Sequence, residues 1–198
     1  MKVLIIFLFI FTSFSGAQTI VLNQDYYSIS KNNTVIFKQN NDTLTIAKCI
    51  RLEKCDTLRK LIFKIEKDSV VNKSTKIIFV KALNKKAENN IINNNGITLV
   101  QYDNGRIGIR ESYNFKGKEK IQHVILYPKS ELENLKPISK ISKKEGKEIF
   151  DNYLSFINSI NDEDDFDFEN YTTMDKFTEL VIKKGYNPIG AYNIIGNN

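Results

Sequence analysis

The feature that most constrains the fold of this chain is a change of hydrophobic period near Pro128. Between about residues 18 and 128 the apolar residues recur at every second position, which is typical of half-buried strands. Beyond Pro128 they recur at every third or fourth position, which is typical of amphipathic helices. The sequence therefore predicts an α+β fold: an antiparallel β-sheet of hairpins and meanders over about residues 18–128, followed by two or three C-terminal helices packed on it.

The clearest strand is "RIGIRESYNF" (106–115), where apolar and polar side chains alternate. "GITLVQY" (96–102) precedes it, and the intervening "DNG" (103–105) is strong hairpin chemistry because asparagine and glycine tolerate positive φ. "IQHVILY" (121–127) follows after a second turn. These segments predict a three-stranded antiparallel meander over 97–127.

Three earlier segments each begin with an aspartate that is followed by threonine or serine: Asp42, Asp56 and Asp68. We interpret each as a strand entrance, where the short polar side chains bond to the backbone of a turn. The same triplet resembles the O-glycosylation acceptor of exported proteins in some Bacteroidetes-type bacteria. A three-residue pattern is unspecific, so turn chemistry is the favoured interpretation.

Two short segments after Pro128 have the spacing of a helix N-terminus. "SELENLK" (130–136) predicts one or two helical turns, with Ser130 and Glu133 spaced as a capping box. Ser142 and Glu145 have the same spacing at the start of a longer helix that extends to residue 160. The apolar stripe of that helix is formed by Ile149, Phe150, Tyr153, Leu154, Ile157 and Ile160.

A last helix is predicted over "MDKFTELVIKKG" (174–185), where the terminal glycine ends it. The predicted organisation is a leader, 1–17, and one mature domain, 18–198, which is β-rich over 18–128, helical over 129–185 and ends in a short tail, 186–198.

The N-terminus has the pattern of a secretory signal peptide. Lys2 precedes an unbroken apolar run of nine residues, Val3 to Phe11, which is far short of the roughly 20 residues that span a bilayer. Ser15 and Ala17 place small residues before a cleavage site at Ala17–Gln18. We therefore expect an exported protein, periplasmic or secreted, that is not held at a membrane after cleavage.

The alternative is an uncleaved membrane anchor, in which Ile20, Val21 and Leu22 extend the apolar run. Polar and small residues between the run and Ile20 argue against this alternative.

Two cysteines, Cys49 and Cys55, remain in the mature chain, and in an exported protein an even pair this close predicts a disulfide. On one straight strand their Cα atoms would lie about 20 Å apart, so the bridge requires a turn between them. Two free buried thiols and a redox-active pair are the alternatives, and the latter lacks the usual CxxC spacing.

The net charge of +6 comes mainly from lysine, since only four of the 29 basic residues are arginines. Lysine lacks the planar fork that recognises phosphates and bases, so we expect a solvated basic surface and no nucleic-acid partner.

Catalytic signatures are sparse. His123 is the single histidine, so one chain cannot assemble a histidine-based zinc site, and its neighbours Ile121, Ile125 and Tyr127 predict a half-buried sheet residue rather than a catalytic base. No nucleophile elbow, metalloprotease or phosphate-loop motif occurs in the sequence, and no cofactor is expected.

The acidic segment "NDEDDFDFEN" (161–170) is a weak calcium candidate. An EF-hand alignment fails because Asn170 and Lys176 occupy the positions of the required glycine and glutamate. We favour a solvated loop before a helix, in which Phe166 and Phe168 are possible partner contacts. The acidic residues concerned are Asp162, Asp164, Asp165, Asp167 and Glu169.

Two functions remain open. The favoured one is an exported, non-catalytic interaction protein, such as an envelope accessory, inhibitor or immunity-type module, whose partner is another envelope or secreted protein. The alternative is a small exported hydrolase that uses carboxylates alone, for example Asp103 or Glu111 of the β meander.

Overall fold

The computed structural model describes residues 20, 22–30, 34–51, 54–88, 96–115, 118–160 and 173–196. For residues 49–51, 54–59, 111–115 and 118–122 it describes the backbone alone. Within these ranges the β-strands are β1 (Tyr26–Ile29), β2 (Thr34–Asn40), β3 (Thr43–Arg51), β4 (Lys54–Asn72), β5 (Thr75–Ala82), β6 (Gly96–Gln101), β7 (Ile107–Phe115) and β8 (Lys118–Pro128). The helices are α1 (Lys85–Glu88), α2 (Lys129–Glu133), the 3₁₀ helix η2 (Ile138–Lys140), α3 (Lys143–Ser159), α4 (Thr173–Lys183) and α5 (Ala191–Ile195).

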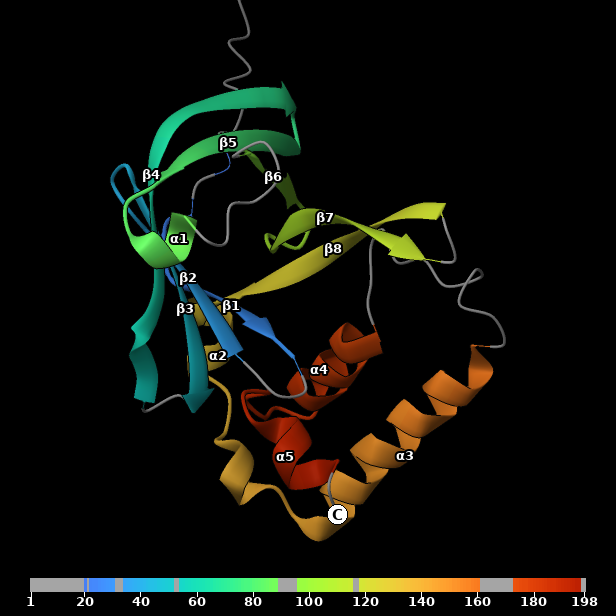
Figure 1. Cartoon of the computed structure of the whole chain (residues 1–198). Coiled ribbons are helices and arrows are strands. Elements are labelled where there is room, and N and C mark those ends of the chain that lie inside the picture. Colours follow the sequence, from blue (N-terminus) through green and yellow to red (C-terminus); the bar gives the residue numbers. More distant parts are fainter. Residues whose placement is uncertain are drawn as a thin grey trace, which may run out of the picture.

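The strands form an antiparallel meander that closes into a barrel (Figure 1). Closure depends on β1 pairing with β8, where Tyr27 lies opposite Tyr127. The α+β class and the meander of β6, β7 and β8 are therefore confirmed. The barrel itself was not predicted, because alternating strands look the same in an open sheet and in a closed one.

β4 is one bent strand, and the division of this region at Asp56 and Asp68 was wrong because both residues lie inside it. The strand pairs with β3 as far as Lys64 and with β5 from Phe63 onward. The register shifts just after Ile65, and such an extra residue lets a strand bend and twist without breaking. The bend carries β4 from one side of the barrel to the next.

Inward-facing side chains from every strand form one apolar cluster. An eight-stranded barrel has an interior just wide enough for side chains to fill, and these side chains occupy it. The strand residues of the cluster are Tyr26, Phe37, Leu44, Phe63, Ile78, Val80, Ile97, Leu99, Ile107, Ile109 and Leu126.

Residues just before β1 complete this interior cluster. Ile20 and Leu22 are 5% and 3% exposed and pack with the strand residues. The carbonyl of Ile20 accepts a hydrogen bond of 3.1 Å from Lys76 Nζ, which also lies 2.5 Å from the carboxylate of Asp68. The segment that would follow leader cleavage is thus part of the barrel core.

The outer face of β1 and β8 is covered by the C-terminal part of the chain. Tyr27, Ile125 and Tyr127 point outward and pack against Leu132 of α2 and against Ile189. Neighbouring residues of a strand alternate between its two faces. One face of β1 and β8 therefore packs in the barrel core, and the other packs against the C-terminal part of the chain.

α3, α4 and α5 pack together, with α4 next to β1, and share a third apolar cluster (Figure 1). The capping box of Ser142 and Glu145 is confirmed at the start of α3. The one predicted at Ser130 and Glu133 is wrong, since α2 begins after Pro128 without a side-chain cap. The third cluster consists of Ile149, Phe177, Val181, Tyr186, Ala191 and Ile195.

The segment after residue 185, which was predicted as a short tail, contains a helix in the structure. Gly185 ends α4 with a φ of 82°, as a terminating glycine should. The chain then forms α5 instead of leaving the domain, and Ala191 and Ile195 are buried against α3 and α4. Five residues are too few for a hydrophobic period to identify a helix.

The chain turns between the two cysteines, since β3 ends at Arg51 and β4 begins at Lys54. The backbone register places Cys49 directly opposite Cys55. Residues opposite each other on antiparallel strands have Cα atoms about 4.5 to 5.5 Å apart, which suits a disulfide. The bridge stays a prediction because both side chains lie outside the described part.

Candidate functional site

The main convergence of charged side chains in the described residues lies where the barrel meets the helices, around Arg106. The β6–β7 turn positions this residue: Gly105 adopts a φ of 80°, and the Asn104 side-chain oxygen accepts a 3.0 Å hydrogen bond from the Arg106 backbone N–H. An asparagine that bonds to the backbone two residues onward stabilises a tight turn. The turn thereby directs the Arg106 side chain toward α2 and α4.

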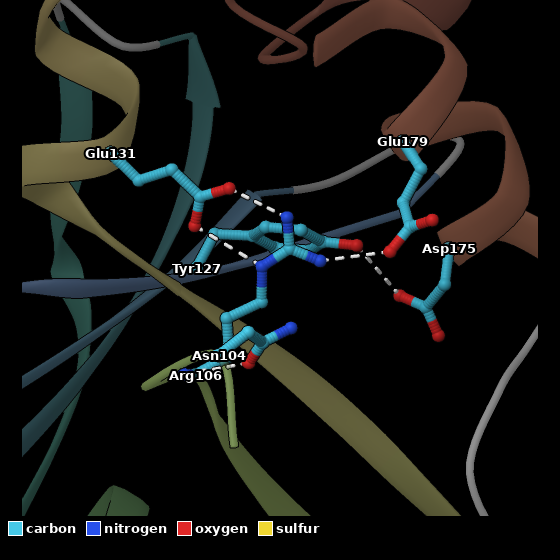
Figure 2. A network of polar contacts seen from close by, with 6 residues as sticks. All are labelled: Asn104, Arg106, Tyr127, Glu131, Asp175 and Glu179. Atoms are coloured by element: carbon cyan, nitrogen blue, oxygen red, sulfur yellow. Dashed lines mark hydrogen bonds and ion pairs between the residues drawn. The ribbon is translucent and has the colours of Figure 1, made fainter. Parts of the chain in front are cut away.

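Figure 2 shows the Arg106 guanidinium between two glutamates from different helices. Its Nε and Nη2 donate to the two oxygens of Glu131 on α2, at 3.1 and 2.6 Å. Its Nη1 donates to Glu179 on α4 at 2.8 Å. The fork geometry matches a carboxylate on one edge and leaves a further donor for a second carboxylate, which a lysine could not do.

Tyr127 extends the cluster toward α4. The Arg106 guanidinium carbon lies 4.7 Å from the centre of the Tyr127 ring, and the Tyr127 hydroxyl donates to Asp175 at 3.3 Å (Figure 2). Tyr127 is fully buried, and Asp175 is 5% exposed. We call Arg106, Tyr127, Glu131, Asp175 and Glu179 the Arg106 cluster.

The Arg106 cluster is an ionic connection between barrel and helices. Burial lowers the pKa of Arg106, but the hydrogen bond and charge of Glu131, with contributions from Tyr127 and Glu179, raise it more, so the guanidinium keeps its proton. The side chain is 14% exposed, so solvent screens these ion pairs less than it screens a surface pair. One residue of the barrel thus holds two helices.

The geometry does not favour catalysis by these carboxylates. Glu131 and Glu179 both accept hydrogen bonds from Arg106, so neither is left to face a substrate with another acid opposite. A neighbouring cavity of about 390 Å³ is lined mainly by Arg106, Lys176 and Lys183 with Glu179. No group of three metal-ligating side chains occurs within the part of the chain that the structure describes.

A second polar contact lies on the outer face of the barrel, where Tyr102 Oη is 2.7 Å from Nδ1 of His123. His123 is half-buried, as expected for a sheet histidine. Gly108 makes room for the Tyr102 ring, because a Cβ at this position would lie 2.8 Å from the Tyr102 hydroxyl. Close approach of this kind is a common reason for a glycine inside a strand.

A groove of about 580 Å³ lies between α3 and α5. We call its apolar lining residues the floor and its charged ones, Lys143, Lys147 and Asp151, the rim. Ile194 on α5 is 39% exposed. We call the whole hollow the α3–α5 groove. Its lining residues are Ile141, Ser142, Lys143, Gly146, Lys147, Phe150, Asp151, Ile194 and Ile195.

The structure describes few of the residues predicted from sequence as functional. Asp103 is exposed in the β6–β7 turn, and Glu111 lies in β7 with its side chain outside the description. The calcium candidate Asp162, Asp164, Asp165, Asp167 and Glu169, the contacts Phe166 and Phe168, and the cleavage site at Ala17 and Gln18 all lie outside the described residues. These remain predictions.

Sequence reasoning missed the Arg106 cluster, although one signal was present. Arg106 is one of four arginines in a chain that otherwise uses lysine, and a bidentate contact is a task that requires arginine. Its partners Glu131 and Glu179 lie 25 and 73 residues away, so no local spacing could associate them.

Comparisons of the chain with protein-family models, with curated proteins and with solved structures found no match. Among the described residues, no helix is both long and apolar enough to cross a membrane.

Proposed function

We propose that the mature protein is an exported, non-catalytic interaction protein that binds another envelope or secreted protein. The proposal rests on the position of the open apolar surface. The barrel interior is occupied by its own side chains, whereas the α3–α5 groove is concave, apolar at its floor and open to solvent. Concave apolar surfaces with a few polar groups are typical of binding sites.

The position of the first mature residues supports the export part of the proposal. Ile20 and Leu22 pack in the barrel core, which favours a leader that ends before them over a longer anchor that includes them. The remaining run, Val3 to Phe11, has the length of a signal peptide core.

The Arg106 cluster supports the non-catalytic part. Its carboxylates are engaged by one guanidinium, and its geometry is explained by the joining of barrel and helices. The alternative hydrolase has no comparable support, because Asp103 lies exposed on a turn with no second acid bonded or paired to it among the described residues.

Affinity capture tests the proposal. Mature protein with a C-terminal tag, expressed in the native host, is crosslinked in intact cells and purified from the envelope and the medium. We expect one host protein in a stoichiometric amount. Reproducible recovery without any such protein, together with turnover of an ester, glycoside or peptide substrate panel, would contradict the proposal.

A further inference from the structure

The α3–α5 groove has an apolar floor that the fold does not need to leave open. Gly146 lines it near the start of α3, where glycine is less favourable than alanine. A Cβ at Gly146 would lie 3.8 Å from Ile195, which is ordinary van der Waals contact. Alanine would therefore fit and strengthen the helix, so packing alone does not explain the glycine.

Two lysines at the start of α3, of which Lys143 lines the groove and Lys144 follows it, carry a charge that is unfavourable at their position in the helix. Lys143 and Lys144 are the first two residues of α3, where the helix dipole presents its positive end. Anionic side chains stabilise this end, and lysines there are unfavourable. These lysines are unfavourable at the positive end of the helix dipole, and no structural benefit offsets their position. Departures of this kind are expected at functional surfaces.

Three lysines at or near the groove have no carboxylate partner in the described part of the chain. The three acids of this part of α3 are each engaged: Glu145 in the capping box, Glu148 with Lys184 at 2.6 Å, and Asp151 with Lys147 at 2.6 Å. In contrast, Lys140, Lys143 and Lys144 are exposed, and within the described ranges no carboxylate lies within ion-pair distance of them.

We infer that the α3–α5 groove binds an acidic peptide segment of the partner protein, with one aromatic or aliphatic side chain anchored on the floor. This inference rests on the proposed function and names its binding surface. The anchor would contact Phe150, Gly146 and Ile194, and its acidic flanks would face Lys143 and Lys144 at the helix N-terminus. Lysines supply long-range attraction, while the apolar floor supplies the contact area.

A titration with a defined probe tests the inference. The probe is a fluorescent synthetic peptide of glutamates and aspartates around a central Leu-Phe pair, and the protein is the full mature chain. We expect saturable binding that weakens with added salt, because the charges at the rim are exposed. A peptide with serines in place of Leu-Phe, and one with lysines in place of the acids, should not bind.

Two protein variants and one control locate the binding. Lys143→Glu with Lys144→Glu should weaken binding about tenfold, since two attractions become repulsions. Glutamates at these positions suit the helix dipole, so loss of binding cannot be assigned to unfolding. Ile194→Asp should abolish anchoring. Lys81→Glu with Lys85→Glu, an equal charge change on exposed lysines of β5 and α1, should leave the affinity unchanged.

Three outcomes would overturn the inference: equal affinity for all variants, binding of vesicles with anionic lipids in place of the peptide, or a self-association of the wild type that Ile194→Asp abolishes. The last would assign the groove to a second copy of this chain. Capture of a host partner by wild type and groove variants alike would refute the inference and leave the proposed function intact. Capture of none by the wild type would refute the proposed function.

Discussion

At the scale of single residues, Arg106 is the charged side chain that connects the barrel with two helices. It is a barrel residue whose donors reach α2 and α4 while its planar face covers Tyr127. The net stabilisation from such a contact depends on its geometry. Partly buried charges lose hydration, and only well-aligned partners compensate for that loss.

The first prediction concerns this side chain. Arg106→Ala should lower the free energy of unfolding by about 2 to 3 kcal/mol, below the range of a fully buried pair because Glu179 is 42% exposed. Arg106→Lys keeps the charge but loses the bidentate contact and should cost roughly 1 kcal/mol. Urea unfolding of the purified variants measures both.

Arg110 provides the matched control, since it lies in β7, four residues after Arg106, with its side chain exposed. Arg110→Ala should change the free energy of unfolding by less than about 0.5 kcal/mol. Equal effects of Arg106→Ala and Arg110→Ala would contradict a joining role for the Arg106 cluster.

At the scale of elements, α3 shows how a helix tolerates an unfavourable first turn. Ser142 accepts a 3.2 Å hydrogen bond from the Glu145 N–H, and the Glu145 carboxylate accepts bonds from the Ser142 backbone and hydroxyl at 3.1 and 2.6 Å. The Glu145 side chain also accepts from the Tyr186 hydroxyl at 3.0 Å. The capping box thus offsets the two lysines that follow Ser142.

A pH dependence follows from this capping box. The hydrogen bonds from the Ser142 side chain and backbone, with one from Tyr186, lower the pKa of Glu145 below its ordinary value of about 4.3. A lowered folded-state pKa stabilises the protein above the ordinary value, and this contribution disappears as the pH falls through the folded-state pKa. Wild type should therefore exceed Glu145→Gln in stability at neutral pH and converge with it in acid.

Melting temperatures of wild type and Glu145→Gln between neutral pH and about pH 3 measure this difference. Glu88→Gln on α1, at an exposed position, is the control and should leave the melting temperature at neutral pH nearly unchanged. A stability gap between wild type and Glu145→Gln that stays constant down to about pH 3 would contradict an ionised capping box.

Local patterns determined how well each element could be predicted from sequence. The hairpin at Gly105, the start of α3 at Ser142 and the end of α4 at Gly185 follow from side-chain and backbone chemistry within a few residues, and all three are correct. β4 was divided at Asp56 and Asp68 because a turn residue inside a bent strand looks like a turn. Nothing local distinguishes the two cases.

At the scale of the whole molecule, the contacts between residues far apart in the chain could not be predicted from the sequence. Closure requires Tyr27 to meet Tyr127, and the joining of barrel to helices requires Arg106 to meet Glu179. Such pairs depend on the path of the entire chain. The same holds for the groove, which needs α5 beside α3.

The N-terminal segment gives a prediction at this scale. Leu22 is 3% exposed and packs in the barrel core, so Leu22→Ala in the mature chain should cost about 2 to 4 kcal/mol through lost burial and an unfilled cavity. Leu83→Ala, at a position 53% exposed, is the control and should cost less than about 1 kcal/mol. Thermal unfolding of both variants gives the comparison, and equal small effects would remove residues 20–22 from the core.

The central claim is that this protein recognises its partner on the helices rather than inside the barrel. Hydrogen–deuterium exchange of the mature protein, alone and in complex with the captured partner, tests it most directly. The account predicts added protection over residues 141–151 and 191–196, around the α3–α5 groove, with the strand amides unchanged. Protection confined to β1 through β8, with α3 and α5 exchanging as in the free protein, would contradict it.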